Sequence, residues 1–321
     1  MTDQAIASAP GKLMLLGEHA VVYGSPCLVA SINKRITVFI KRLTVNKLHL
    51  SLPDLKFDKK FNLRDLYIHS SPHQAVFVIS AVSHFFHYFR KQSGLSIKTK
   101  SDFLPQLGLG SSSAVTVATL KALSRIFAKT ISHENLFNLA FQSVKAVQKK
   151  ISGFDLAAAV YGGIIYYQLN KSVLNLPKKN IPLLIVYSGI KADTEKMVNM
   201  VYQSKKINPL KVNRLFAAIS QLVDKAKIAY KEDNWPLLGD LFNQNQKILT
   251  ELGVSTAKLN LLAKTAVSSG AYGAKLSGAG GGDCLIVLYK VERRAQIIDA
   301  IKKNGGSLLD VFPETQGVKL L

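Results

Sequence analysis

Acidic residues and cysteines are scarce in this 321-residue chain. It has 20 Asp and Glu against 42 Lys and Arg, which gives a formal net charge of +22, and it has two cysteines. Cys27 and Cys284 lie far apart in the sequence, and neither has a CxxC partner or a pair of histidines at zinc spacing. The composition therefore argues against a disulfide scaffold and against a zinc module.

Long hydrophobic runs are also missing. The longest apolar stretch, residues 74–86, contains Ser80, Ser83 and His84 and is shorter than the ~20 residues that span a bilayer. The first four residues lack the basic and apolar regions of a secretory signal. With 48% hydrophobic and 19% charged residues, the chain has the composition of a folded protein. We expect a cytoplasmic protein with no membrane partner.

The excess of positive charge does not gather into one segment. The basic residues recur as short pairs along the chain: Lys41-Arg42, Lys59-Lys60, Lys149-Lys150, Lys178-Lys179, Lys205-Lys206 and Lys302-Lys303. None of these pairs extends into a basic arm of the kind that binds nucleic acid. We interpret the charge as a solvated basic surface that attracts anionic small molecules by electrostatic steering, and nucleic acid is not an expected partner.

The hydrophobic periodicity predicts a mixture of strands and helices. Strands are expected at residues 12–16, 35–40, 95–100, 183–187, 285–289 and 308–312. Helices are expected at 74–91, from 113 to about 128, at 134–149 and at 292–303, and the region 209–269 is expected to be mostly helical with a break near Trp235-Pro236. Ser132 is the predicted N-cap of the helix at 134–149. A change of pattern near residue 175 predicts two domains, 1–175 and 176–321.

The two commonest nucleotide-binding loops are absent. Gly11-Lys12 is followed by Leu13 where a phosphate loop needs Ser or Thr, and Gly108 and Gly110 lack the third glycine of GxGxxG. The segment from Gly108 to Ser113 nevertheless opens a predicted helix. Because a helix N-terminus offers unpaired N–H groups and a partial positive charge, this segment can bind a phosphate. A glycine turn with a serine cap is the structural alternative.

Two further segments combine glycines with polar residues. Residues 275–284 place four glycines among five consecutive positions just before a predicted strand, which indicates a backbone that takes unusual dihedral angles or packs closely. In residues 9–24, Lys12, Glu18 and His19 lie in and beside an otherwise apolar strand. Polar side chains in such a place are expected to be paired or to face a ligand.

Together the three segments resemble, in the same order, the motifs of the GHMP kinase superfamily, and most of all its mevalonate-pathway branch. Ala9–Gly24 resembles the first motif, Gly108–Ser112 the phosphate-binding second motif, and Lys275–Cys284 the glycine-rich third motif. The resemblance implies an α+β protein with an N-terminal ribosomal-protein S5-like domain and a C-terminal ferredoxin-like domain. It also implies that ATP and a small-molecule substrate bind between the two domains.

The resemblance also implies roles for individual residues. Asp155 matches the catalytic aspartate of the family and Lys12 its partner lysine. A carboxylate can accept the proton of an alcohol, and a nearby ammonium keeps the carboxylate ionised. The implied ATP-binding residues are Gly108, Leu109, Gly110, Ser111, Ser112 and Ser113. The implied substrate-binding residues are Glu18, His19, Thr194, Gly278, Ala279 and Gly280.

Magnesium is expected to accompany ATP, with Ser112 as a ligand by the same resemblance. In the family pattern an acidic residue about eleven positions before the catalytic aspartate completes the metal site. The corresponding segment here is Val144-Lys145-Ala146, which has no carboxylate. Glu18 or Asp155 would have to take its place.

The motifs leave the acceptor open. Gly17-Glu18-His19 is similar to mevalonate kinases, whereas Ser152–Asp155 and Gly281–Cys284 are similar to phosphomevalonate kinases, and Lys149 and Lys150 could serve a second phosphate. Our prediction is phosphorylation of mevalonate, with 5-phosphomevalonate as the alternative acceptor. An inactive ligand sensor or nucleic-acid-binding relative is a further alternative, and the presence of both Lys12 and Asp155 argues against it. A homodimer is left open.

Overall fold

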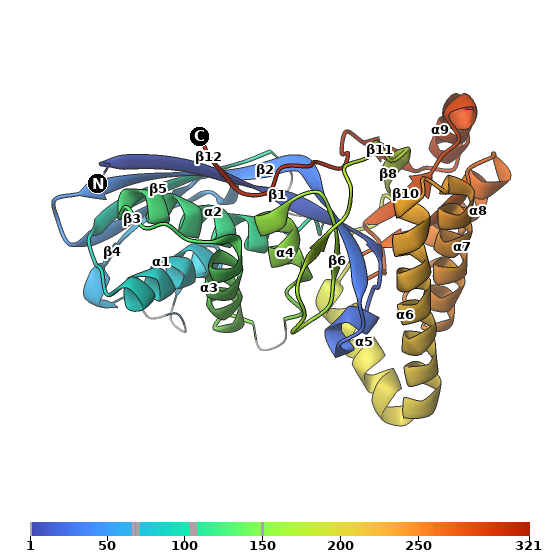
Figure 1. The fold of residues 1–321 in the computed structure, drawn as a ribbon, viewed down its shortest axis with the longest axis horizontal. Coiled ribbons are helices and arrows are strands. Elements are labelled where there is room, and N and C mark those ends of the chain that lie inside the picture. The colour runs from blue at the N-terminus through green and yellow to red at the C-terminus, as the bar shows by residue number, and fades with distance from the viewer. Residues whose placement is uncertain (1, 66–67, 69–70, 103–107, 149–150) are drawn as a thin grey trace.

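The fold is built on two β-sheets. The computed structural model describes residues 2–65, 68, 71–102, 108–148 and 151–321. The larger sheet has the order β12-β1-β2-β5-β3-β4, and β6 and β7 extend it from β2. Its strands are β1 (Gln4–Leu16), β2 (Cys27–Leu43), β3 (Lys47–Leu52), β4 (Phe57–Asn62), β5 (Gly94–Ser101), β6 (Ile164–Tyr167), β7 (Leu174–Asn175) and β12 (Lys319–Leu320). The smaller sheet has the order β11-β8-β10-β9, and Figure 1 shows it at the opposite end of the molecule.

Four helices cover one face of the larger sheet (Figure 1). They are α1 (Val76–Phe89), α2 (Ser111–Ile126), α3 (His133–Lys145) and α4 (Phe154–Tyr161). Helices α2 and α4 contact β1 and β2 directly, and α1 and α3 pack against α2. The buried face of α1 carries Val78, Val82 and Phe85 at helical spacing, as its sequence predicts. Burial of this apolar stripe holds the helical layer on the sheet.

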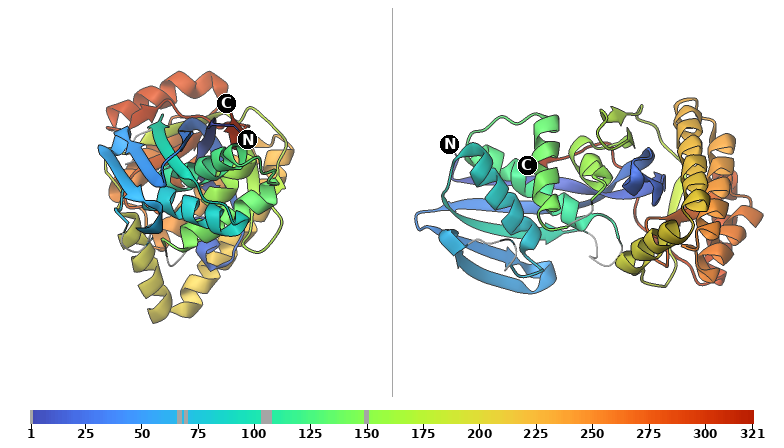
Figure 2. Two further views of the ribbon diagram at one scale, coloured as in Figure 1. Left: turned by 90° about the vertical axis from the view of Figure 1, so that its left-hand side faces the viewer. Right: turned by 90° about the horizontal axis from the view of Figure 1, so that it is seen from below.

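A second group of helices packs around the smaller sheet. The strands are β8 (Leu183–Tyr187), β9 (Gly273–Ser277), β10 (Cys284–Leu288) and β11 (Ser307–Leu309), and the helices are α5 (Thr194–Ile207), α6 (Pro209–Lys231), α7 (Trp235–Glu251), α8 (Ala257–Ser268) and α9 (Arg294–Lys303). Helices α7 and α8 lie against β9, and α9 contacts β11. Figure 2 shows this group at one end of an elongated molecule. No helix in the described part of the chain is long and apolar enough to cross a membrane.

Most predicted elements are present, with differences at their ends. The Ser132 hydroxyl accepts a hydrogen bond from Asn135 N at 3.2 Å, which confirms the predicted cap of α3. The prediction that this helix continues to residue 149 is wrong, because α3 ends at Lys145, where Val147 N turns back to the carbonyl of Val144 in a tighter turn. Lys149 and Lys150 lie outside the described residues. Helix α5 and strand β9 were not predicted.

The chain crosses from the larger sheet to the smaller one after β7 and returns at its end. Strand β12 pairs with β1 in antiparallel register, with Ala7 opposite Leu320. Arg35 fixes the same segment, since its guanidinium donates to the carbonyls of Gln316 and Gly317 at 3.0 and 2.7 Å. The domain division at residue 175 stays a prediction. The last strand belongs to the larger sheet although it follows the whole of the smaller one.

Candidate active site

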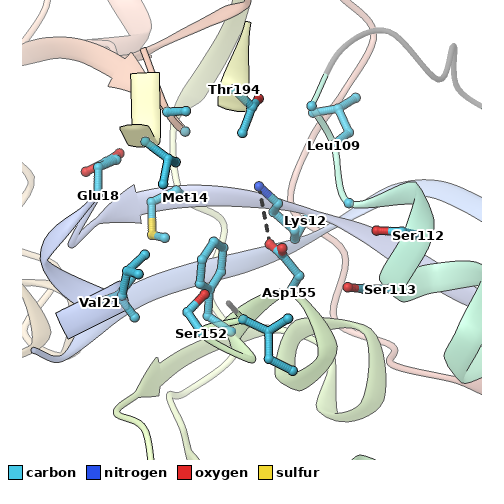
Figure 3. A pocket seen from close by; sticks show the side chains of 18 of the residues that line it. Lys12, Met14, Glu18, Val21, Leu109, Ser112, Ser113, Ser152, Asp155 and Thr194 are labelled. Carbon is cyan, nitrogen blue, oxygen red and sulfur yellow. Dashed lines mark ion pairs between the residues drawn. The ribbon is translucent and has the colours of Figure 1, made fainter. Parts of the chain in front are cut away.

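A pocket of about 370 Å³ opens where β1, the loop before α2, the start of α4 and the glycine loop after β9 meet (Figure 3). This volume is in the range of small-molecule sites. The pocket brings together all the residues singled out in the sequence: Lys12, Glu18, His19, Gly108, Leu109, Gly110, Ser111, Ser112, Ser113, Asp155, Thr194, Gly278, Ala279 and Gly280. Residues more than 260 positions apart in the chain therefore share one cavity.

The N-terminus of α2 faces this pocket. Gly108 and Gly110 take positive φ angles of 62° and 84°, which favour glycine, and Gly110 is the N-cap residue without a side-chain cap. A Cβ atom on Gly110 would lie 2.8 Å from Lys12 Cγ, so glycine also permits the close approach to β1. The loop is anchored by a hydrogen bond from Lys12 N to the carbonyl of Leu109 at 2.8 Å. The uncapped helix end can therefore bind an anion.

Lys12 and Asp155 form an ion pair in the pocket, with Lys12 Nζ 3.3 Å from Asp155 Oδ1 (Figure 3). Lys12 lies on β1, and Asp155 lies in the first turn of α4, where the helix dipole favours a carboxylate. Among the described residues, no donor forms a hydrogen bond with Asp155 Oδ1, although this oxygen is buried. A buried acceptor without a donor is energetically costly. The Lys12 ammonium offsets part of this cost, and the Asp155 side chain, which is 35% exposed and lines the pocket, can still accept from a ligand hydroxyl.

The loop before α4 holds Asp155 in place. Gly153 has a φ of 82°, and a Cβ atom there would lie 2.5 Å from the hydroxyl oxygen of Tyr167. That hydroxyl donates to the carbonyl of Ser152 at 2.7 Å. Burial raises the pKa of Tyr167 well above its usual value, so the phenol stays a donor. The backbone before Asp155 is thus fixed by Tyr167 of β6, a strand of the larger sheet.

Glu18 is placed differently from the expectation. Its side chain has no exposed surface, and its two carboxylate oxygens contact Lys275 Nζ and Asn245 Nδ2, the latter at 3.0 Å. Burial lowers the pKa of Lys275, while the charge of Glu18 acts in the opposite direction. Glu18 lines the pocket, but its oxygens already have partners on β9 and α7. Its predicted roles, orienting the substrate or replacing the missing metal ligand, would require breaking these contacts.

His19 and the glycine loop meet at the pocket wall. His19 Nε2 lies 2.9 Å from the carbonyl oxygen of Ala279. Because a carbonyl only accepts, Nε2 carries the proton. Burial lowers the pKa of His19 and favours the neutral ring. Its backbone takes a φ of 60°, which is rare for a residue with a side chain and is held by this packing.

Thr194 and Asp283 also line the pocket. Thr194 is the first residue of α5, whose N-cap Asp193 accepts from Lys196 N at 2.9 Å. Asp283 Oδ1 accepts from Ala192 N at 2.9 Å, so it fixes the loop that leads to Thr194. Burial raises the pKa of Asp283. Asp283 was noted in the sequence as part of the third motif but was not assigned to the site.

The pocket offers few ligands for a metal. Within the described residues, no three His, Cys, Asp or Glu side chains gather where they could hold a metal ion. Val144, at the position of the family's acidic residue, is buried and apolar. Ser112 and Asp155, with Ser111, Ser113 and the Asp283 carboxylate, are oxygen donors that line the pocket beside a helix end that can hold phosphates. Such a set fits Mg²⁺ that arrives bound to phosphates and keeps most of its waters, rather than a metal held by protein alone.

Comparison with models of known families shows the class of protein to which this chain belongs. The model of the GHMP kinase N-terminal domain matches residues 76–163, the model of the C-terminal domain matches residues 218–307, and the galactokinase galactose-binding signature matches residues 2–42. The first match covers α1 to α4, and the second runs from the middle of α6 to the first residue of β11, which includes α7, α8, α9, β9 and β10. The expected two-domain α+β GHMP kinase fold is confirmed.

Comparison with individual relatives shows which family of this superfamily the chain belongs to. The mevalonate kinase of Pyrococcus furiosus is 32% identical over 99% of this chain and 98% of its own length. The crystal structure of the Methanococcus jannaschii mevalonate kinase has a TM-score of 0.83, with 28% identity over 96% of this chain and 98% of its own. The crystal structure of "L. major mevalonate kinase in complex with R-mevalonate" has a TM-score of 0.75, with 26% identity over 99% of this chain and 96% of its own. The chain belongs to the mevalonate kinase family of GHMP kinases.

Proposed function

We propose that this protein transfers the terminal phosphoryl group of ATP to the hydroxyl of mevalonate. The observation that carries the proposal is the geometry of Lys12 and Asp155, a pair 3.3 Å apart beside an uncapped helix end. The full-length relatedness to mevalonate kinases supports it, and so does the R-mevalonate bound in the L. major relative. ATP is the phosphoryl donor, as in other kinases of this superfamily.

The loop before α2 binds the phosphoryl donor, ATP. The triphosphate of ATP binds against the backbone N–H groups of residues 110–113, where the helix dipole favours negative charge. Mg²⁺ enters with ATP, and the Ser112 hydroxyl and the Asp155 carboxylate are the oxygens of this chain placed to meet it. The ion would neutralise charge on the phosphates.

The acceptor side belongs to Asp155 and Lys12. The acceptor hydroxyl donates a hydrogen bond to the Asp155 carboxylate, and its oxygen attacks the terminal phosphorus. The bond between this phosphorus and the bridging oxygen of ADP breaks, and the hydroxyl proton passes to Asp155. Lys12 pairs with Asp155 and stabilises the charge of the transferring group. The phosphate ester, ADP and a proton are the products.

The rest of the acceptor meets the wall formed by His19, Thr194 and residues 278–280. These residues supply backbone N–H groups, a neutral imidazole and a hydroxyl, which suit a hydroxy acid. Lys149 and Lys150, the cations considered for a second phosphate, lie outside the described residues. A cytoplasmic location and a homodimer stay predictions from the sequence.

The test is turnover with two acceptors side by side. Purified protein is incubated with ATP, Mg²⁺ and either mevalonate or 5-phosphomevalonate, and release of ADP is followed. We expect ADP release that depends on mevalonate. Release with 5-phosphomevalonate alone would assign the protein to the next phosphorylation. Release with neither acceptor, in protein that still binds ATP, would favour a ligand-binding relative without catalysis.

A further inference from the structure

Strand β9 turns alternate residues toward the end of β1. Lys275 and Ser277 are two positions apart, so their side chains share one face of the strand. Lys275 Nζ contacts the Glu18 carboxylate, and Ser277 Oγ donates to the carbonyl of Met14 at 2.8 Å. Two positions further, the Ala279 carbonyl accepts from His19. The third motif is therefore linked to the first at three successive points.

The contact between Lys275 and Glu18 is enclosed by protein. Both side chains have no exposed surface, and Asn245 of α7 completes the set by donating to Glu18 at 3.0 Å. We call Glu18, Asn245 and Lys275 the Glu18 cluster. A buried ion pair contributes little net stability, because desolvation of both charges offsets their attraction. Its effect is instead to define which atoms meet, here the end of β1 with β9 and α7.

The glycine loop that follows β9 depends on these links. Gly278 has a φ of 97°, and a Cβ atom built on it would meet nothing within 4 Å. The loop therefore has no side chain of its own at this point to fix it against the pocket wall. Glycines in sequence leave a backbone with many accessible conformations. The links at Lys275, Ser277 and His19 hold the first half of the loop, and hydrogen bonds from Gly281 N to the carbonyl of Val254 at 2.8 Å and from Asp283 N to the carbonyl of Ile190 at 2.7 Å hold the second half.

The donor loop is anchored elsewhere. Residues 108–113 are held to β1 through the hydrogen bond from Lys12 N to Leu109 O and by the close packing of Gly110 on Lys12. The donor loop also lies close to Asp283, whose Oδ2 would be 3.0 Å from a Cβ atom on Gly108, but the contacts that hold it to β1 do not involve the Glu18 cluster. We therefore expect a change in the Glu18 cluster to affect the acceptor wall, formed by His19, Thr194 and residues 278–280, more than the donor loop.

We propose that the Glu18 cluster positions His19 and residues 278–280 for the acceptor, so that Glu18 and Lys275 are positioning residues and not substrate ligands. The proposal rests on the proposed function for the identity of the acceptor. It goes beyond the proposed function because it assigns Glu18, Lys275 and Asn245 a task that involves no contact with the substrate.

A double-variant cycle tests this proposal. Lys275→Met leaves the Glu18 carboxylate buried without its cation, and we expect the KM for mevalonate to rise about tenfold or more while the KM for ATP changes by less than about twofold. Glu18→Gln is expected to act in the same direction. In the double variant the uncompensated charge is gone, so the KM for mevalonate returns toward the wild-type value. Lys179→Met is the matched control, because it breaks the partly exposed pair with Asp233 and should change neither KM.

Hydrogen exchange of the ligand-free protein gives a readout that needs no turnover. We expect faster amide exchange across residues 276–282 in Lys275→Met and no change there in Lys179→Met. If Lys275→Met fails to fold, Ser277→Ala removes the neighbouring link to Met14 without burying a charge, and a smaller change of the same kind is expected. If wild-type protein does not use mevalonate, the proposed function fails, while the exchange result still tests the cluster.

Three results would overturn the proposal. Direct binding of the acceptor by Glu18 predicts that the double variant is no better than Glu18→Gln alone. A purely structural role predicts a lower melting temperature with both KM values and the exchange of residues 276–282 unchanged. An equal rise in the KM for ATP and for mevalonate would show that the cluster does not act on the acceptor wall in particular.

Discussion

Two lysine–carboxylate pairs lie in and beside one pocket, and they differ in what surrounds them. In the pair of Lys12 with Asp155 the side chains are 10% and 35% exposed, whereas in the pair of Lys275 with Glu18 both values are 0%. Glu18 has a donor on each carboxylate oxygen. Asp155 has a buried oxygen without a hydrogen-bond donor among the described residues.

This difference separates a chemical role from a positioning role. A carboxylate can accept the proton of a substrate only through an oxygen that is free and within reach. Asp155 lines the pocket with a side chain that is 35% exposed, whereas Glu18 is unexposed and both of its oxygens have protein donors. The sequence places Lys12 and Glu18 in one motif and gives no sign that their partners lie in opposite surroundings. The predictions below test whether the two pairs do separate tasks.

The largest effect is expected at Asp155. Asp155→Asn keeps the shape of the side chain but removes the base and its charge, so kcat should fall by about 10³-fold or more. Affinity for a non-hydrolysable ATP analogue, measured by calorimetry, should stay within about threefold, because the phosphates bind at the α2 loop. Turnover close to the wild-type value would exclude Asp155 from the reaction.

The next effect concerns stability, where the pair of Lys275 with Glu18 should matter more than the pair of Lys12 with Asp155. Lys275→Met should lower the free energy of unfolding by about 3–5 kcal/mol, the usual loss when a buried charge loses its partner. Lys12→Met should cost about 1 kcal/mol or less, because Asp155 is partly exposed and screened by solvent. Urea denaturation of both variants measures this. Equal losses would mean that burial does not distinguish the pairs.

A smaller effect is expected on the donor side. Ser112→Ala removes a hydroxyl oxygen from the first turn of α2 and should raise the KM for Mg·ATP about tenfold. The KM for mevalonate should stay near its wild-type value, since the acceptor wall is supported separately. Titrating Mg²⁺ at fixed ATP measures the change. Wild-type kinetics in this variant would show that the metal is held by other oxygens.

The smallest effect is a pH dependence that comes from His19. Burial lowers its pKa from the ordinary value of 6.5, so the unfolded chain binds more protons than the folded one between the native pKa and 6.5. The stability contribution is therefore complete above pH 6.5, falls as the pH is lowered through this window, and levels off below the native pKa. Urea midpoints of wild type and His19→Gln between pH 7.5 and 5 should show a weaker decline in the variant. An identical decline would assign the titration to other groups.

The sequence predicted the parts of the site that depend on local patterns. The glycines before a helical pattern located the α2 loop, and the serine at position 132 located the cap of α3. The first motif located Lys12, and the resemblance of residues 152–155 to the family's catalytic segment located Asp155. Each of these signals lies within a few neighbouring residues. The resemblance then placed them in one cleft, and the structure brings all the named residues to one pocket.

The residues that were missed depend on distant partners. Lys275 and Asn245 contact Glu18 across 257 and 227 positions of the chain, and no local pattern records this. Strand β9 has five residues and contains a lysine, so its pattern does not read as a buried strand. The lysine in a short apolar segment just before the glycine run was the available signal, since a buried lysine requires a partner. Glu18 was assigned to the substrate because its motif was known and its neighbours were not.

A crystal structure with mevalonate and a non-hydrolysable ATP analogue tests the contrast between the two pairs most directly. We expect the acceptor hydroxyl within about 3 Å of the Asp155 carboxylate, the terminal phosphate at the start of α2, and Glu18 still bound to Lys275 and Asn245. An acceptor bound by Glu18, with Lys275 displaced and Asp155 out of reach, would contradict it.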